Sequence, residues 1–286
     1  MTNDVPEAVA ALPPLREVIA RNDLAARRRL GQHFLLDLNL TGRIARAAGA
    51  IGEGTVIEVG PGPGGLTRAL LMADAAKVIA VERDARCIEA LADLREAAAG
   101  RLEIVEGDAL EIDIASLGDA PRRIVANLPY NISVPLLIDW LEKAERFASM
   151  TLMFQKEVAD RITATTGDKS YGRLAVLANW RCRTRILFDI PARAFTPPPK
   201  VVSAVVELIP YDEPPHPCDI TALQSVAAAA FGQRRKMLRR SLGSLGVNTE
   251  ALLEAAGLDP TARAESLDIA QFAALARALV SLPGAP

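Results

Sequence analysis

The sequence predicts an α/β protein with a doubly wound, mostly parallel sheet and a small all-helical C-terminal domain. From Thr55 onward, short β-branched runs alternate with segments of helical spacing up to about residue 155. A glycine-dense turn directly follows the first of these runs. After the proline-rich stretch 211–217, the remaining sequence is helical in pattern. We therefore expect a domain over 1–210, which includes an N-terminal helical segment at about 13–50, and a second domain over 211–286.

The individual elements follow from the period of the hydrophobic residues. Strands are predicted at 55–59, 77–82, 102–106, 122–127, 149–155 and 201–208. Helices are predicted at 13–26, 39–48, 66–74, 84–97 and 134–145. In an open α/β sheet of this kind, ligands bind beyond the carboxyl ends of the strands.

Composition limits the possible classes of function. Hydrophobic residues make up 50% of the chain and the net charge is −2, so any nucleic-acid site must be local. Three cysteines and two histidines form no zinc-binding spacing, so we expect no metal. No apolar run reaches the roughly 18 residues of a membrane-spanning helix, and the N-terminus carries no export signal. We expect a cytoplasmic protein without membrane contact.

The stretch from Thr55 to Thr67 predicts a strand, a tight loop and a helix N-terminus. Gly60, Gly62 and Gly65 fit the dinucleotide fingerprint G-x-G-x-x-G, whereas Gly60, Gly62 and Gly64 fit the G-x-G-x-G of S-adenosylmethionine-dependent methyltransferases. Both patterns expect an acidic residue about 20 positions on, where Glu82 ends the next strand. The loop therefore indicates an adenosine-containing cofactor and leaves its identity open.

The tetrad Asn127-Leu128-Pro129-Tyr130 favours methyl transfer. It follows the apolar run 124–126 and so lies at the carboxyl end of a strand. The side-chain oxygen of Asn127 can accept a hydrogen of a planar amino group, which favours a pyramidal nitrogen with an available lone pair. Pro129 stiffens the turn, and Tyr130 can stack on an extruded base. The simpler alternative is a turn that only ends a strand.

Two other segments have both a functional and a structural interpretation. Asp108 ends the third strand and can accept a hydrogen bond from the adenine of a cofactor, or can simply close a turn. The stiff loop Phe195–Lys200 carries three prolines and suits either an active-site rim or a rigid connector.

Basic residues gather near the C-terminus. On a predicted helix, Met237 and Leu238 can pack inward while the charges cover more than one face. We favour a phosphate-facing patch over a solvated surface. The residues are Arg234, Arg235, Lys236, Arg239 and Arg240. The run Arg27–Arg29 is equally compatible with a phosphate contact and with a solvated helix end.

Taken in order, these segments resemble the bacterial small-subunit (16S) ribosomal RNA adenine N6,N6-dimethyltransferases. The resemblance spans nearly the whole chain. It is carried by Leu30–Leu35, Glu58–Thr67, Glu82, Gly107-Asp108, Asn127–Tyr130, Phe195–Val201 and Phe231–Leu242. It implies a class I methyltransferase sheet, which is Rossmann-like, and a small helical C-terminal domain that binds RNA or the ribosome.

The resemblance also assigns roles to residues. It implies that S-adenosylmethionine, which leaves as S-adenosylhomocysteine, is contacted at His33, Leu35, Gly60, Gly62, Glu82, Asp108 and Asn127. It implies that Asn127–Tyr130 hold the target amino group and that Phe195 sandwiches the base with Tyr130. The family usually has Asn where this chain has His33, and an imidazole donates without amide geometry, so this contact could become pH-dependent.

The implied activity is direct in-line transfer that dimethylates two neighbouring adenosines in a hairpin loop near the 3′ end of the small-subunit RNA. The implied partner is an immature small subunit, late in ribosome assembly, and nothing in the sequence requires a dimer. Three alternatives remain: a resistance-type methyltransferase for large-subunit RNA, a protein glutamine N5-methyltransferase, and an RNA-binding assembly checkpoint whose catalysis is secondary. Leu128 replaces the first proline of the glutamine enzymes' Asn-Pro-Pro-Tyr.

Overall fold

The computed structural model describes residues 5–24 and 32–282. The basic run Arg27–Arg29, together with Leu30 and Gly31, lies outside the described residues. The chain divides into two compact units, the first comprising residues 1–159 and 185–210 and the second comprising 160–184 and 211–286.

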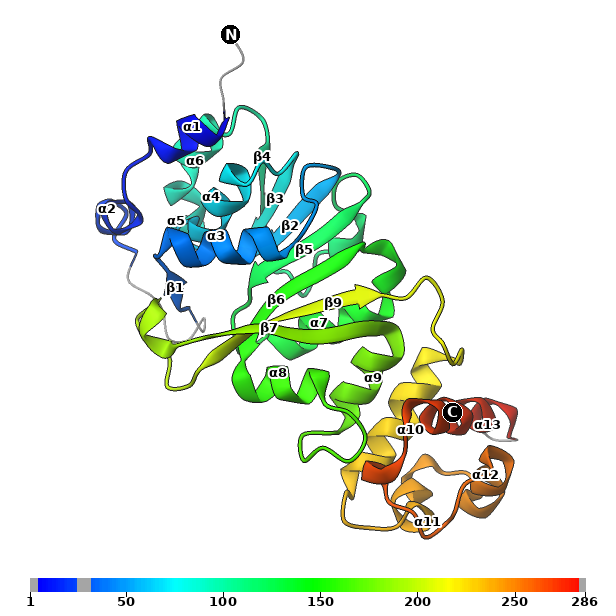
Figure 1. Ribbon diagram of the computed structural model, residues 1–286. Helices are drawn as coiled ribbons and strands as arrows, with labels where there is room; N and C mark the ends of the chain where they lie inside the picture. The colour runs from blue at the N-terminus through cyan, green and yellow to red at the C-terminus, as the bar shows by residue number, and fades with distance from the viewer. Residues whose placement is uncertain (1–4, 25–31, 283–286) are drawn as a thin grey trace. The chain divides into compact units, whose positions relative to one another are not determined.

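The first unit contains a seven-stranded sheet in the order β4-β3-β2-β5-β6-β9-β7 (Figure 1). The first five of these strands are parallel to one another, and β9 runs antiparallel to β6. The strands are β2 (Thr55–Val59), β3 (Val78–Glu82), β4 (Leu102–Glu106), β5 (Arg122–Asn127), β6 (Ser149–Gln155), β7 (Cys182–Ile190) and β9 (Ser203–Pro210). All six predicted strands are confirmed to within about two residues at each end.

Helices precede and connect these strands. They are α1 (Val5–Ala10), α2 (Leu15–Arg21), α3 (Leu38–Ala47), α4 (Gly65–Met72), α5 (Ala85–Ala90), α6 (Ala92–Ala97), α7 (Ser133–Glu142) and α8 (Lys156–Thr163). Both α1 and α3 pack against α4. The single helix predicted at 84–97 is wrong in that the structure has two helices there, α5 and α6. The amide N–H of Leu91 bonds to the carbonyls of both Cys87 and Ile88, which tightens the turn and separates α5 from α6.

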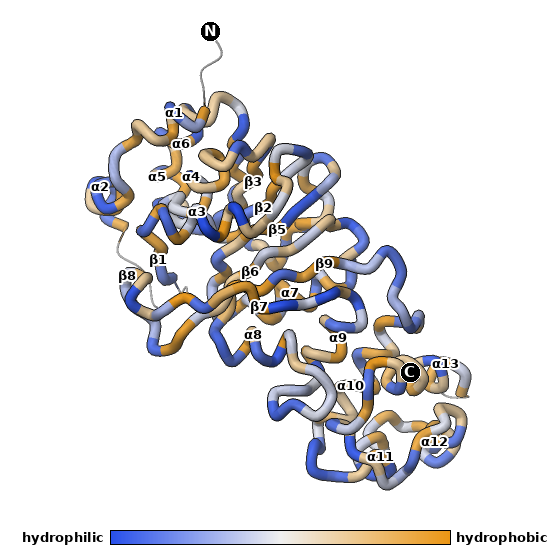
Figure 2. Tube along the Cα trace, viewed as in Figure 1, coloured by the Kyte–Doolittle hydropathy of each residue, from blue (hydrophilic) through white to orange (hydrophobic). Residues whose placement is uncertain are grey.

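The strand sequences explain why the sheet forms. All residues of β2 and β3 are buried, as expected for parallel strands covered on both faces. Strand β6 is also largely hydrophobic (Figure 2), and its five central residues are buried. The strand order reverses at β2, which has β3 on one side and β5 on the other. This switch point is where an open α/β sheet forms its ligand crevice.

A second, two-stranded sheet lies near this crevice. Strand β1 (Phe34–Leu35) pairs antiparallel with β8 (Phe195–Thr196), so that Leu35 is opposite Phe195. Neither two-residue strand is expected from the sequence pattern, because each is too short to show a period.

The second unit is helical. It contains α9 (Arg173–Arg181), α10 (Ile220–Gly232), α11 (Leu238–Ser241), α12 (Thr249–Ala256) and α13 (Ile269–Ser281). Its core includes a contact between the rings of Tyr171, Phe231 and Phe272, whose centroids are 5.8 and 5.5 Å apart. Among the described residues, no helix is long and apolar enough to cross a membrane.

The predicted helix through the basic run 234–240 is wrong. Helix α10 ends at Gly232, and residues 233–236 form a turn before α11. Met237 makes a β-bridge with Arg263 and is 37% exposed, which contradicts the expected inward packing. Leu238 is buried as expected. The bridge to Arg263 fixes Met237 in an extended conformation, so the five basic residues do not share one helix.

Candidate active site

A cleft opens at the carboxyl ends of β2, β3 and β5, at the switch point of the sheet. The short strand β1 and the start of α4 complete its walls. The cleft is lined by Gln32, His33, Phe34, Leu35, Glu58, Gly60, Pro61, Gly62, Pro63, Gly65, Leu66, Glu82, Arg83, Asn127, Leu128, Pro129, Tyr130, Asn131 and Ile132. The predicted glycine loop, acidic strand end and Asn127 tetrad therefore meet in one place.

The glycine loop adopts a backbone that needs glycine. Gly60, Gly62 and Gly64 have φ values of +72°, +55° and +87°. A Cβ atom on Gly65 would lie 2.5 Å from the carbonyl oxygen of Leu35. The loop is therefore packed directly beneath β1, and its main chain is open to a ligand on the cleft side.

Glu82 is held by main-chain donors and keeps one acceptor position. Its Oε1 accepts from the N–H groups of Arg83 at 2.8 Å and Asp84 at 2.9 Å, while its Oε2 accepts from Gly62 N–H at 3.2 Å. A carboxylate has about four lone-pair positions, so one remains on Oε2. Burial raises the pKa of Glu82, and the three N–H donors oppose this.

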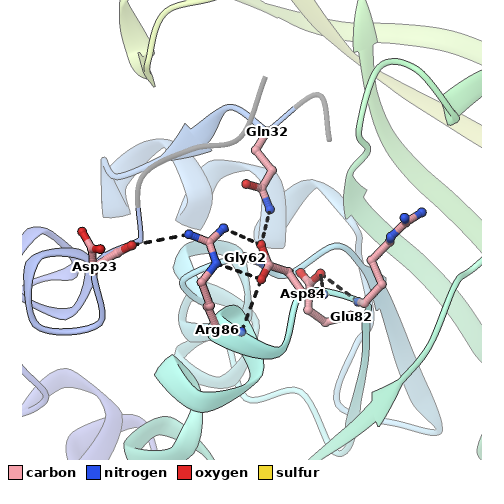
Figure 3. Close-up of polar contacts among 7 residues, drawn as sticks. Asp23, Gln32, Gly62, Glu82, Asp84 and Arg86 are labelled. Atoms are coloured by element: carbon pink, nitrogen blue, oxygen red, sulfur yellow. Dashed lines mark hydrogen bonds and ion pairs between the residues drawn. The ribbon is translucent and has the colours of Figure 1, made fainter. Parts of the chain in front are cut away.

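Asp84 extends this cluster to Gln32 and Arg86 (Figure 3). Its side chain is 5% exposed and forms an ion pair of 2.7 Å with Arg86. It also accepts from Nε2 of Gln32 at 3.3 Å. The Arg86 guanidinium lowers the pKa of Asp84 to about 2. The sequence analysis missed Asp84. Asp84 is the N-cap residue of α5, and its carboxylate accepts the N–H of Arg86. An N-capping residue type two positions after Glu82 was the sequence feature that could have identified it.

Asn127 lies at the end of β5 with its amide orientation fixed. Its Nδ2 donates to the main-chain oxygen of His33 at 3.1 Å. Because a carbonyl oxygen only accepts, the side-chain atom of Asn127 that faces it must be the nitrogen, and the other side-chain atom is therefore Oδ1. Within the described residues, Oδ1 has no hydrogen-bond partner. The oxygen of Asn127 is therefore available to accept a hydrogen from a ligand.

The rest of the tetrad forms a rigid wall. Leu128 is buried, and Pro129 and Tyr130 line the cleft. The hydroxyl of Tyr130 lies 2.5 Å from Oγ of Ser203 on β9. Burial raises the pKa of Tyr130, so its phenol stays neutral.

The ring of His33 contacts the rings of Tyr130 and Phe195. The ring centroids of His33 and Tyr130 are 5.5 Å apart, and those of His33 and Phe195 are 6.4 Å apart. Phe195 is 2% exposed and packs in the core, while His33 lines the cleft. Leu35 is buried, and its carbonyl oxygen covers the glycine loop.

Asp108 is one step removed from the cleft. Its Oδ2 forms an ion pair of 2.7 Å with Arg83, and its Oδ1 accepts from the N–H of Leu110 at 3.0 Å. Arg83 lines the cleft, whereas Asp108 is not among the residues that line it. An adenine amino group would have to share Asp108 with Arg83.

Glu58 is a second buried carboxyl group that the sequence analysis did not assign. It is 1% exposed and lines the cleft, and the hydroxyl of Thr67 donates to its Oε2 at 2.7 Å. Burial raises its pKa to about 8. An acidic residue inside the apolar strand 55–59 was the available signal.

The sheet and cleft together define a class I methyltransferase fold. The chain matches the family model described as ribosomal RNA adenine dimethylase over residues 23–280. It is 63% identical to the ribosomal RNA small subunit methyltransferase A of Rhodospirillum rubrum, over 94% of this chain and 93% of that protein. It is 61% identical to the protein of the same name from Paramagnetospirillum magneticum, over 95% of this chain and 96% of that protein.

Two solved structures of methyltransferases also resemble this chain. A dimethyladenosine transferase from Plasmodium falciparum has a TM-score of 0.72 and 28% identity, covering 85% of this chain and 96% of that chain. The 23S rRNA methyltransferase ErmE has a TM-score of 0.65 and 28% identity, covering 87% and 100% respectively. The chain belongs to the ribosomal RNA adenine dimethylase family, which confirms both the resemblance and the expected fold.

Proposed function

We propose that this protein transfers methyl groups from S-adenosylmethionine to N6 of two adjacent adenosines in a 3′-terminal hairpin loop of small-subunit rRNA and dimethylates each. The observation that carries this proposal is the free Oδ1 of Asn127, which is oriented by His33 in the same cleft as Glu82. The names of the relatives support the small subunit rather than the large one.

The cleft fits the proposed cofactor. Glu82 keeps one acceptor position for a hydroxyl donor such as a ribose hydroxyl, and the glycine loop exposes main chain where side chains would fill the space. Gly60, Gly62, Leu35 and Glu82 would hold it, with Asp108 acting beside Arg83. When bound, S-adenosylmethionine supplies an electrophilic methyl group on a sulfonium.

The tetrad would prepare the target nitrogen. The exocyclic nitrogen of adenine is a weak nucleophile because its lone pair is delocalised into the ring. Oδ1 of Asn127 would accept one of its hydrogens and favour a pyramidal nitrogen. Leu128 and Pro129 fix the position of Asn127, and Tyr130 offers a face on which the base can stack.

The second unit would contribute to binding the RNA. We propose that residues 1–210 carry methyl transfer and that 211–286 bind the RNA and the small ribosomal subunit. Arg235, Lys236, Arg239 and Arg240 make no ion pair among the described residues, which suits phosphate contacts. Arg234 is instead paired with Glu265 at 3.1 Å. We expect one copy of the protein to act in the cytoplasm on an immature small subunit.

Methyl transfer can be tested with S-adenosylmethionine that carries a labelled methyl group. Unmethylated small subunits, large subunits and a release-factor protein would each be incubated with the enzyme, and the labelled product identified by mass. We expect N6,N6-dimethyladenosine at two neighbouring positions of small-subunit RNA. Label in large-subunit RNA or in protein would instead support the resistance-type or the glutamine methyltransferase.

A further inference from the structure

The ring of Tyr130 is held at its far end by a residue from another strand. Its hydroxyl oxygen lies 2.5 Å from Oγ of Ser203, the first residue of β9. Ser203 is 0% exposed, and among the residues that the structure describes its side chain makes no other hydrogen bond. The buried hydroxyl of Ser203 therefore has its partner on a residue that lines the cleft.

The main chain around Ser203 is fixed by its neighbours. In the antiparallel pairing of β9 with β6, Ser203 is opposite Gln155, the residue at the carboxyl end of β6. The carbonyl oxygen of Val202 accepts from the N–H of Lys156 at 2.9 Å. The start of β9 is thus tied to β6 and to the residue that follows β6. Oγ of Ser203 consequently has a defined position at the end of the sheet where the cleft opens.

The main chain of Tyr130 is fixed separately from its ring. Its carbonyl oxygen accepts from Oγ of the buried Ser133 at 3.1 Å, and the carbonyl of Pro129 accepts from the N–H of Ile132 at 3.1 Å. A fixed main chain still allows several side-chain rotamers. The bond from the phenol to Ser203 selects one of them and so determines where the ring lies.

We propose that Ser203 is a positioning residue for the target base, because its hydroxyl holds the ring of Tyr130 in the orientation on which the adenine stacks. This inference rests on the proposed function and deepens it. Ser203 acts through Tyr130 and contacts neither the base nor the cofactor. A stacking surface that is already in place when the base arrives removes an ordering cost from the transfer step.

Removing the hydroxyl should slow methyl transfer more than it weakens binding. Ser203→Ala should lower kcat on unmethylated small subunits by about two- to twelvefold, the net value of one hydrogen bond. The KM for subunits should stay within about twofold, because residues 211–286 are proposed to bind the subunit. Tyr130→Ala, which removes the stacking surface itself, should lose more, roughly five- to 150-fold.

A double substitution separates positioning from stability. Tyr130→Phe breaks the same bond from its other end and leaves the buried Oγ of Ser203 without a partner. Each single change should lower the midpoint of thermal unfolding, whereas Ser203→Ala combined with Tyr130→Phe should recover most of it, because no polar group is then left unpaired. The kcat of the double variant should stay as low as that of the more impaired single variant, because the ring still lacks its anchor.

Thr55→Val is the matched control. Thr55 is 1% exposed, and its Oγ1 accepts from the N–H of Asp119 at 2.9 Å. It begins β2, so it lies at the end of the strand opposite to the cleft. Thr55→Val should lower the unfolding midpoint and leave kcat unchanged. This variant and the Ser203 and Tyr130 variants should keep the Kd for S-adenosylhomocysteine within about twofold of wild type, which also shows that they fold.

Three results would overturn the proposal. Ser203→Ala could keep the kcat of wild type, the double variant could recover kcat together with its stability, or affinity for S-adenosylhomocysteine could fall in step with kcat. In each case the bond between Ser203 and Tyr130 would contribute to stability alone or act on the cofactor. Wild-type enzyme that forms no dimethyladenosine would instead refute the proposed function itself.

Discussion

Replacing Asp84 by Asn should destabilise the first unit by about 2 kcal/mol at pH 7. The Asp84 carboxylate is almost fully buried. Its pKa is lowered from 3.8 to about 2, mainly because the Arg86 guanidinium donates hydrogen bonds to it. Each pKa unit corresponds to about 1.4 kcal/mol, so a shift of nearly two units gives about 2 kcal/mol. Solvent screening removes little of this value because the side chain is 5% exposed.

The sign of the pH dependence follows from the lowered pKa. The folded protein holds the carboxylate charged at pH values where the unfolded chain binds a proton. The stabilisation is therefore complete above about pH 4 and is lost as the pH falls toward 2. About half of the difference between wild type and Asp84→Asn should have disappeared at pH 3.

Urea unfolding followed by tryptophan fluorescence can measure this difference. The chain has two tryptophans, and a Trp180→Phe background leaves Trp140 as a reporter in the first unit. Asp93→Asn is the matched control, because Asp93 forms a 2.6 Å ion pair with Arg21 but its side chain is 50% exposed. The control should cost less than about 1 kcal/mol. Equal losses for the two variants at pH 7, or a difference that does not shrink toward pH 3, would refute the reasoning.

Three other changes test the site and its surroundings. Asn127→Ala should lower kcat by about 100-fold or more, with S-adenosylhomocysteine binding retained within about tenfold; unchanged turnover would remove Asn127 from the mechanism. If the inactive Asn127→Ala protein still binds immature subunits and alters their maturation, an assembly role exists apart from catalysis. Arg234, Arg235 and Lys236 changed together to Ala should weaken subunit binding and reduce its logarithmic salt dependence by about 0.7 to 0.9 for each phosphate that is no longer neutralised, with Arg234 contributing least because Glu265 already pairs with it. Glu58→Gln should gain stability over wild type by about 1.4 kcal/mol per pH unit between pH 5 and 7. Burial raises the folded pKa of Glu58 to about 8, so wild-type unfolding releases a proton throughout that range, and parallel unfolding curves at pH 5 and 7 would contradict this.

The parts of the fold that the sequence predicts are those whose signal is local. The β-branched run 55–59 stops at Gly60 and the apolar run 124–126 stops at Asn127, and the structure has strands 55–59 and 122–127 with the predicted bounds. The glycine loop and Glu82 obey spacing rules within one βαβ unit, so their meeting in one cleft follows from topology.

The parts that escape prediction depend on contacts between distant residues. His33 reaches Pro197 across 164 positions and Asn127 across 94. A two-residue strand has no periodicity from which such contacts could be predicted. The basic run shows the same limit, because the residues from 234 onward have helical composition, yet the bridge between Met237 and Arg263 breaks the helix.

The short segment around β1 contacts both the glycine loop and Asn127, and so positions the cofactor side and the target side of the cleft. The carbonyl of Leu35 lies over Gly65 in the loop proposed to hold the cofactor, while the carbonyl of His33 orients the amide of Asn127. Pairing of β1 with β8 then adds the loop that holds the imidazole. Because His33 directly precedes β1 and Leu35 ends it, a shift of this strand would displace the cofactor side and the target side together. Changes that move the main chain of β1 should therefore impair both cofactor binding and turnover.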